Sequence, residues 1–235
     1  PYGKTFKNRK RHSPESVKLA KTIADESTVL LKNENQLLPL DAKSLKSIAI
    51  IGPNADQVQF GDYTWSRNNK DGVTPLQGIK NRVNKNTAIH YAKGCSLTSL
   101  DTSGIAEAVE AAKNSEVAVI FGGSASAALA RDYKSSTCGE GFDLNDLNLT
   151  GAQSQLIREV YRTGTPVILV LVTGKPFVIE WEKNNLPAIL VQWYAGEQAG
   201  NSIADILFGK VVPSGRLTFS FPRSTGHLPV YYNYL

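Results

Sequence analysis

Four carboxylates gather in one stretch of the sequence, ARDYKSSTCGEGFDLNDLNLTGAQ at residues 130–153, and they are Asp132, Glu140, Asp143 and Asp146. A carboxyl group can act as a general acid or base, and the glycines on either side of Glu140 would let bare backbone carry it into a neighbouring cleft. The other interpretation is a solvated acidic loop in which Asp143 and Asp146 are turn or cap residues, and this chain alone favours it.

The same stretch is a long connection between two expected elements, a strand that ends at Gly123 and a helix that begins near Ala152. Connections in α/β units typically have 2–6 residues, and loops beyond about 15 residues without structure of their own are usually functional or disordered. The length of this loop therefore makes it the first place to look for chemistry.

Metal chemistry has no support in the spacing of the usual ligands. The histidines are far apart, at His12, His90 and His227, and neither Cys95 nor Cys138 belongs to a CxxC pair. We therefore expect no metal site. Cys95 follows the apolar stretch AIHYAKG and is expected to be a small buried thiol, while the spacing leaves a single disulfide open.

Nucleotide binding and serine hydrolase chemistry also lack their motifs. The turn IIGPNAD at residues 50–56 follows an expected strand but contains neither GxGxxG nor GxxxxGK[ST], and no serine lies in a GxSxG elbow. We expect no cofactor, and we interpret Asn54 and Asp56 as turn residues.

Continuous apolar runs alternate with amphipathic segments along the chain. The runs predict strands buried on both faces, as in parallel sheets, and they are SIAIIG, TAIHYA, EVAVIFGG, PVILVLVTG and PAILVQWYAG, at residues 47–52, 87–92, 116–123, 166–174 and 187–196. Helical spacing predicts helices over residues 14–31, 105–112, 156–160 and 203–207, and RLTFSF predicts a final strand at 216–221. This order predicts a three-layer α/β/α sandwich with a mostly parallel sheet.

Three of the apolar runs end in glycine, at Gly52, at Gly122 with Gly123, and at Gly174. Ligands of open α/β sheets bind outside the carboxyl ends of the strands. We therefore expect a site in the loops that follow these glycines.

The net charge of +5 belongs to the N-terminus rather than to the whole chain. Five of the 26 basic residues, with no acid among them, are Lys4, Lys7, Arg9, Lys10 and Arg11, and the other 21 balance the 21 acidic residues. Nucleic-acid binding needs clustered charge on a folded body, so we interpret residues 1–13 as a basic interdomain linker and 14–235 as the folded domain. No run reaches the roughly 20 apolar residues that span a bilayer. Neither a nucleic acid nor a membrane is therefore an expected partner.

Several segments occur in an order that is far more specific than any one of them. They run from about residue 12 to residue 233 and are HSPESVKLAKTIADESTVLLKNENQLLPL, IAIIGPNAD, FGDYTW, VTPLQGI, CGEGFDLNDLNLTGAQSQLI, GEQAGNSIADILFGKVVPSGRLTFSFPR and LPVYYN. Together they resemble the second domain of glycoside hydrolase family 3. In that family a (β/α)8 barrel comes first and an α/β sandwich second, with the active site between them.

The resemblance implies a retaining β-glycosidase, of β-glucosidase or β-xylosidase kind, that acts on terminal non-reducing β-linked sugars. Retention needs two carboxyl groups about 5 to 5.5 Å apart. In the family the attacking Asp comes from the barrel, and the proton donor is a Glu on a loop of the sandwich. The family's GEG pattern falls on CGEGFD, so the resemblance assigns Glu140 as the general acid/base. We expect the isolated chain to be inactive because it lacks the attacking Asp.

The sequence departs from the family at one point of this loop. The family commonly has EG-x-DR, whereas Leu144 follows Asp143 here, so any charge-assisted contact of that Arg is missing or supplied elsewhere. Trp65 and Trp193 lie at expected strand ends and are candidates to stack on a sugar, with packing at a domain interface as the alternative. Asp132 is a candidate lip residue of the substrate site.

The resemblance also implies the partners of the domain. These are a β-linked oligosaccharide or an aryl or alkyl glycoside, and the barrel of the same parent chain, relative to which this domain is expected to be truncated at both ends. A periplasmic or secreted location is favoured. The alternative function is a non-catalytic carbohydrate-binding or scaffolding module with the same fold and an inert acidic loop.

Overall fold

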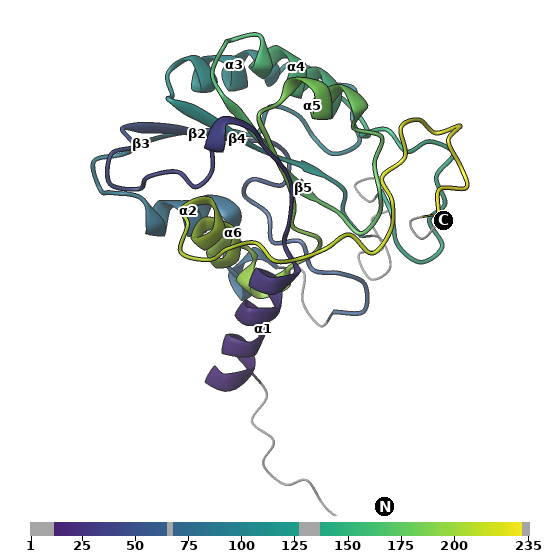
Figure 1. The fold of residues 1–235 in the computed structure, drawn as a ribbon, viewed down its shortest axis with the longest axis horizontal. Coiled ribbons are helices and arrows are strands. Elements are labelled where there is room, and N and C mark those ends of the chain that lie inside the picture. The colour runs from purple at the N-terminus through teal and green to yellow at the C-terminus, as the bar shows by residue number, and fades with distance from the viewer. Residues whose placement is uncertain (1–11, 65–67, 127–136, 232–235) are drawn as a thin grey trace, which may run out of the picture.

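A sheet with strand order β1-β6-β5-β4-β2-β3 lies at the centre of the computed structural model, which describes residues 12–64, 68–126 and 137–231 (Figure 1). The strands are β1 Val29–Asn33, β2 Ser47–Ile51, β3 Ala88–Ala92, β4 Val117–Gly123, β5 Val167–Val172 and β6 Ala188–Val191. Among these strands, β2 to β6 pair in parallel and β1 pairs antiparallel with β6. The expected mostly parallel sheet is confirmed.

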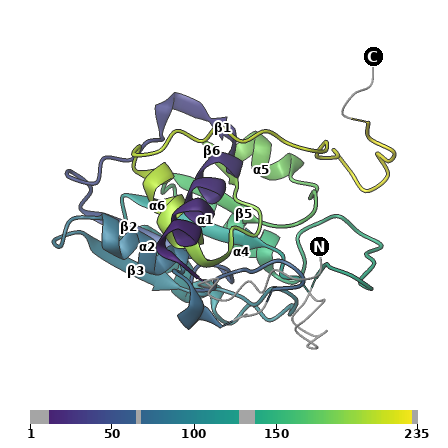
Figure 2. The ribbon, with the colours of Figure 1, turned by 90° about the horizontal axis from the view of Figure 1, so that it is seen from below.

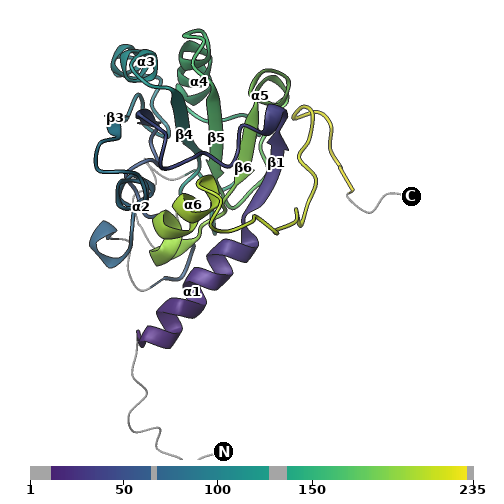
Figure 3. The ribbon, with the colours of Figure 1, turned by 60° about the vertical axis from the view of Figure 1, so that its left-hand side comes forward.

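Helices cover both faces of this sheet. Figures 1 and 3 show α3, α4 and α5 on one face and α2 and α6 on the other, and α1 contacts α6, beside which it lies in Figure 2. The helices are α1 Pro14–Ser27, α2 Pro75–Arg82, α3 Ile105–Lys113, α4 Gln153–Tyr161, α5 Glu180–Asn185 and α6 Ala199–Leu207, with short 3-10 turns at Glu34–Gln36, Asn69–Asp71 and Gly196–Gln198. The predicted three-layer α/β/α sandwich is therefore confirmed.

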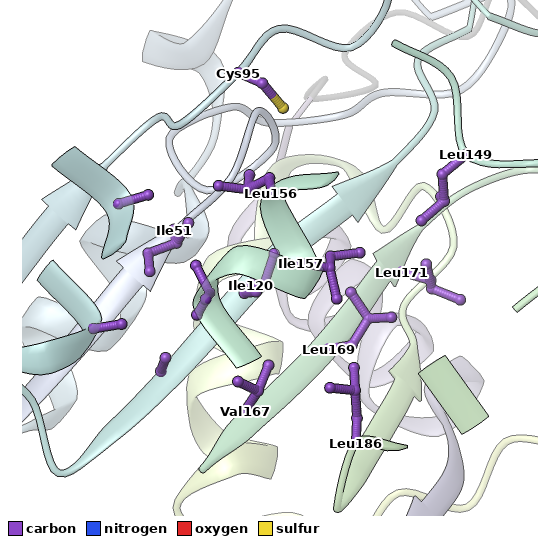
Figure 4. Close-up of a cluster of buried hydrophobic side chains, with 14 of the residues drawn as sticks. Ile51, Cys95, Ile120, Leu149, Leu156, Ile157, Val167, Leu169, Leu171 and Leu186 are labelled. Carbon is purple, nitrogen blue, oxygen red and sulfur yellow. The ribbon is translucent and has the colours of Figure 1, made fainter. Parts of the chain in front are cut away.

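Alternate side chains of each central strand enter two separate apolar clusters. In β5, Ile168 and Val170 face the cluster formed with α2 and α6, whereas Leu169 and Leu171 face the cluster formed with α3 and α4. Figure 4 shows the second cluster, in which these two leucines lie near Ile157 of α4. Each fully buried side chain of this size contributes about 1.5–3 kcal/mol. The apolar runs are continuous because both faces of the strand are covered.

The first helix is shorter than the sequence pattern predicts. Its start is confirmed, since the Ser13 side chain accepts a hydrogen bond from Ser16 N–H at 3.3 Å, but it ends at Ser27 rather than at residue 31. Thr28 is extended, with φ −66° and ψ 130°, and Val29–Asn33 then pairs with β6 as β1. The aliphatic residues that follow Thr28 fit the period of a helix as well as that of a strand. Their spacing therefore did not show where the helix ends and the strand begins.

The predicted final strand at residues 216–221 is wrong. These residues form no strand in the structure; just before them, Gly215 N–H donates at 3.0 Å to the carbonyl oxygen of Thr28, the residue that precedes β1. Phe219 instead meets Trp193 edge to face with ring centroids 5.4 Å apart, and Phe221 packs on the cluster beneath α3 and α4. The alternation in RLTFSF reflects this packing, without the backbone ladder that would make it a strand.

Cys95 is a buried thiol, as expected, and both Cys95 and Cys138 are free. Burial raises the pKa of the Cys95 thiol from its ordinary value of 9.0 to about 11. The folded state therefore keeps a proton that the unfolded state releases, so this thiol's contribution to stability is lost as pH rises from 9.0 towards 11.

We expect iodoacetamide at pH 8 to alkylate Cys95 about 100-fold more slowly in the native protein than in urea, because the thiolate fraction falls tenfold per pKa unit. Mass spectrometry of the Cys95 peptide measures both rates. Equal rates would show that the thiol is not buried.

Candidate active site

The loops after β2 and β4 meet at the point where the strand order of the sheet reverses. β3 lies on one side of β2, and β4, β5 and β6 follow on the other. In open α/β sheets the strand ends at such a point leave a crevice in which ligands bind. Gly52 begins the first loop with φ +113°, and a Cβ there would lie 2.4 Å from Phe121 O. Only glycine lets the two loops begin this close together.

A buried amide joins these two loops. Asn54 is fully buried, and its Nδ2 donates to Gly122 O at 3.4 Å and to Ser124 O at 3.3 Å. Its Oδ1 accepts from Gln59 Nε2 at 2.8 Å. Asn54 lies in a turn, as the sequence indicated, but its side chain also holds the loop after β2 against the end of β4.

The acidic loop is fixed to the sheet at Thr137 and Cys138, both of which are buried. Thr137 N–H donates to Ala125 O at 2.9 Å, and its Oγ1 accepts from Ala125 N–H at 3.1 Å. Cys138 forms a parallel bridge with Ser126. The backbone that leads into Glu140 is therefore paired with the chain that leaves β4.

A tyrosine from the loop after β6 supports the same segment. The Tyr194 hydroxyl lies 2.6 Å from Ser124 Oγ and 2.7 Å from Cys138 Sγ. Burial, together with the neighbouring Cys138, raises the pKa of Tyr194 above its ordinary value, so the hydroxyl keeps its proton. Tyr194 thereby connects the loops after β4 and β6.

Glu140 follows this anchored segment, and its side chain is exposed. Gly139 and Gly141 have φ +118° and +72°, in the region that favours glycine. The Glu140 N–H donates to Asp62 Oδ2 at 3.1 Å, and Asp62 belongs to the loop after β2. The structure thus places an exposed carboxyl on a loop that is held at the switch point, and its catalytic role stays a prediction.

The other described carboxylates of the acidic loop are arranged differently. Asp146 Oδ1 accepts from Asn148 Nδ2 at 2.6 Å, from Asn148 N–H at 2.9 Å and from Thr225 Oγ1 at 2.9 Å. These hydrogen bonds, those from Asn148 above all, lower the pKa of Asp146. The bond from Asn148 N–H confirms the turn role considered for Asp146, and Asp143 and Asp146 are both exposed.

A lysine that the sequence analysis missed lies beside this loop. Lys175 Nζ is buried, has no hydrogen-bond partner within the described part of the chain, and lies 4.8 Å from the centroid of the Phe177 ring. Burial lowers the pKa of Lys175, and the nearby Cys138 and Asp146 oppose this shift. The available signal was its position directly after Gly174, one of the strand-end glycines.

Of the remaining predicted site residues, the structure describes Trp193. Trp65 and Asp132 lie outside the residues that the structure describes. Trp193 Nε1 donates to Ser27 O at 2.9 Å, and its ring packs on Phe219. Its described contacts are thus packing within the domain, and its contact with a sugar stays a prediction.

The part of the chain that the structure describes contains no group of three or more His, Cys, Asp or Glu side chains that could hold a metal ion. No helix within those residues is long and apolar enough to cross a membrane.

Known proteins are similar in sequence to this chain over most of its length. The family model described as the glycosyl hydrolase family 3 C-terminal domain matches residues 28–235. A β-xylosidase of Formosa agariphila is 42% identical over 224 residues, which cover 93% of this chain and 30% of the relative. A periplasmic β-glucosidase of Salmonella typhimurium is 39% identical over 242 residues, with the same 93% and 30%. The chain therefore spans less than a third of the length of these relatives.

Solved structures share the fold as well. A β-glucosidase from Listeria innocua has a TM-score of 0.83 and 30% identity, with 98% of this chain and 30% of that chain covered. A β-glucosidase from Erythrobacter marinus has a TM-score of 0.81 and 34% identity, with coverage of 94% and 32%.

Proposed function

The chain belongs to glycosyl hydrolase family 3, as the C-terminal domain of that family, and we propose that it supplies Glu140 as the general acid/base of a retaining β-glycosidase. The observation that carries this proposal is the position of Glu140. Its side chain is exposed, while its backbone is held by Asp62 and its loop by the end of β4. An exposed carboxyl on an anchored loop can enter a site that a second domain completes.

The chemistry divides between two domains. A carboxylate of the barrel attacks the anomeric carbon, and the Glu140 carboxyl gives its proton to the glycosidic oxygen as that bond breaks and the alcohol leaves. The Glu140 carboxylate then removes a proton from water, which attacks the glycosyl–enzyme ester, releases the sugar and restores both carboxyl groups. The 235-residue chain alone is expected to be inactive because it supplies one of the two groups.

The relatives support a β-glucoside or β-xyloside as the substrate, since they include β-glucosidases and a β-xylosidase. We extend the proposal to a terminal β-linked sugar of an oligosaccharide. A periplasmic or secreted location is part of the same proposal, and the periplasmic relative of Salmonella typhimurium supports it.

Glu140→Gln in the full-length enzyme tests the role of the carboxyl. Proton donation matters when the leaving group is a poor one, and general acid catalysis contributes about 10²–10⁴-fold. We therefore expect kcat/KM to fall by about 10²-fold or more for an alkyl β-glycoside but by less than about fivefold for a 2,4-dinitrophenyl β-glycoside.

The ratio of the losses in kcat/KM on the two substrates distinguishes a catalytic from a structural role of Glu140. Equal losses on both substrates would assign Glu140 a structural role and favour the non-catalytic interpretation of the acidic loop. Asp143→Asn is the matched control, because Asp143 is an exposed carboxylate of the same loop, and it should leave both values near those of the wild type.

A further inference from the structure

Asp62 is the residue through which the loop after β2 holds Glu140. Its Oδ2 accepts the Glu140 backbone N–H at 3.1 Å, across 78 positions of sequence. A hydrogen bond to an ionised carboxylate is roughly twice as strong as one between neutral groups. This contact therefore fixes the backbone of Glu140 more firmly than a neutral acceptor would.

Glu140 lies between two glycines, Gly139 and Gly141, whose backbone is free to adopt many conformations. Gly139 and Gly141 have no side chains, and the hydrogen bond from Phe142 N–H to Gly139 O at 3.1 Å stays within the turn itself. The anchors at Thr137 and Cys138 precede the turn. The bond from Asp62 is the described contact that ties the Glu140 backbone to another loop.

The second oxygen of Asp62 adds no described hydrogen bond that would stabilise the fold. Oδ1 is buried and has no hydrogen-bond partner among the described residues. A buried acceptor without a donor is unfavourable for folding. No described cation forms an ion pair with Asp62. Among the described residues, the hydrogen bond from Glu140 N–H is the side-chain hydrogen bond that Asp62 makes.

We infer that Asp62 is a positioning residue for the acid/base of the proposed reaction, on which this inference rests. It keeps the Glu140 backbone in place, so that the carboxyl meets the glycosidic oxygen in one geometry. A misplacement of about 1 Å can lower a rate by about 10²-fold. Loss of the Asp62 carboxylate should therefore weaken proton donation while nucleophilic attack continues.

The test compares Asp62→Ala, Asp62→Asn and Asp56→Asn in the full-length enzyme. We expect Asp62→Ala to lower kcat/KM for an alkyl β-glycoside by about 10–100-fold, the range expected for a lost charge-assisted hydrogen bond, and for a 2,4-dinitrophenyl β-glycoside by less than about threefold. Asp62→Asn keeps an oxygen that can accept the Glu140 N–H, so its loss on the alkyl glycoside should be smaller, about 3–10-fold.

Asp56→Asn is the matched control, since Asp56 lies on the same loop but accepts from Thr74 Oγ1 at 2.8 Å instead. It should lower both activities equally or not at all. If Asp62→Ala does not fold, Asp62→Asn decides by itself, because a loss confined to the alkyl glycoside supports positioning.

Equal losses on both substrates, or no loss, would overturn the role of Asp62. Glu140→Gln separates this failure from a failure of the proposed function. If Glu140→Gln distinguishes the two leaving groups and the Asp62 variants do not, Glu140 is the acid/base and Asp62 is only structural. If Glu140→Gln does not distinguish them, both proposals are wrong.

Discussion

Glu140→Ala in the full-length enzyme is expected to accumulate a glycosyl–enzyme with an activated substrate and to release it as a β-glycosyl azide when azide is added. A 2,4-dinitrophenyl leaving group departs without a proton, so the intermediate still forms. Its hydrolysis needs a base for water, and without Glu140 the steady-state rate should fall by about 10²–10⁴-fold. Azide is an anion that needs no base, and the shortened side chain leaves room for it.

Steady-state kinetics and NMR of the product measure this outcome. Azide should raise kcat of Glu140→Ala by at least about tenfold, since the step that it accelerates limits the rate. Attack on the same face as water in a double displacement gives the β-anomer. An α-glycosyl azide, or no azide product, would contradict the assignment of Glu140.

Two control proteins accompany this variant. The wild-type enzyme should gain nothing from azide, because its base already activates water. Asp143→Ala removes an exposed carboxylate from the same loop and should behave like the wild type. An azide product from Asp143→Ala would move the assignment to that residue.

Gly123→Ala is expected to destabilise the domain by about 4 kcal/mol or more, which is exceptional for a single substitution. Gly123 ends β4 opposite Val172 of β5, with φ +122°. A Cβ there would lie 2.2 Å from Val172 O and 2.9 Å from Val172 C, and both atoms belong to backbone. The two central strands must separate to admit it, at the point where the loop to Glu140 begins.

Urea unfolding of the full-length enzyme, followed by tryptophan fluorescence, measures this effect. Gly164→Ala is the matched control, with φ +82° but nothing within 4 Å of the added Cβ. Gly164→Ala should therefore lose only the free energy that an alanine pays for a positive φ, about 1–2 kcal/mol. Equal, small losses for both variants would show that the contact between β4 and β5 is not as tight as described.

The sequence predicted the layers of this fold better than their edges. A strand that is buried on both faces has one continuous apolar run in its sequence, as in Val167–Val172, because every residue is removed from solvent. The edge strand β1 was merged into the first helix, because Val29 continues the helical spacing of α1. The short helices α2 and α5 were not predicted, since segments of 8 and 6 residues carry little periodicity.

The candidate site was predictable only in part. Glu140 came from the GEG pattern of a family, and the glycines at strand ends indicated which loops to consider. Asp62, Tyr194 and Lys175 come from the loops after β2, β6 and β5, and no spacing in the sequence relates these residues to Glu140. Trp193 was a candidate for sugar contact because it lies at an expected strand end, but its indole N–H donates a hydrogen bond to Ser27 O in the structure.

The sequence by itself determined which segments lose water, and therefore the strands, the layers and the loops at the strand ends, because burial is recorded in the local pattern of side chains. Only the tertiary structure decided which loops meet. The order of the strands places β2 beside β4, and this brings Asp62 to the backbone of Glu140 across 78 positions. The physical reason is that strand order depends on contacts between distant segments, which local periodicity does not encode.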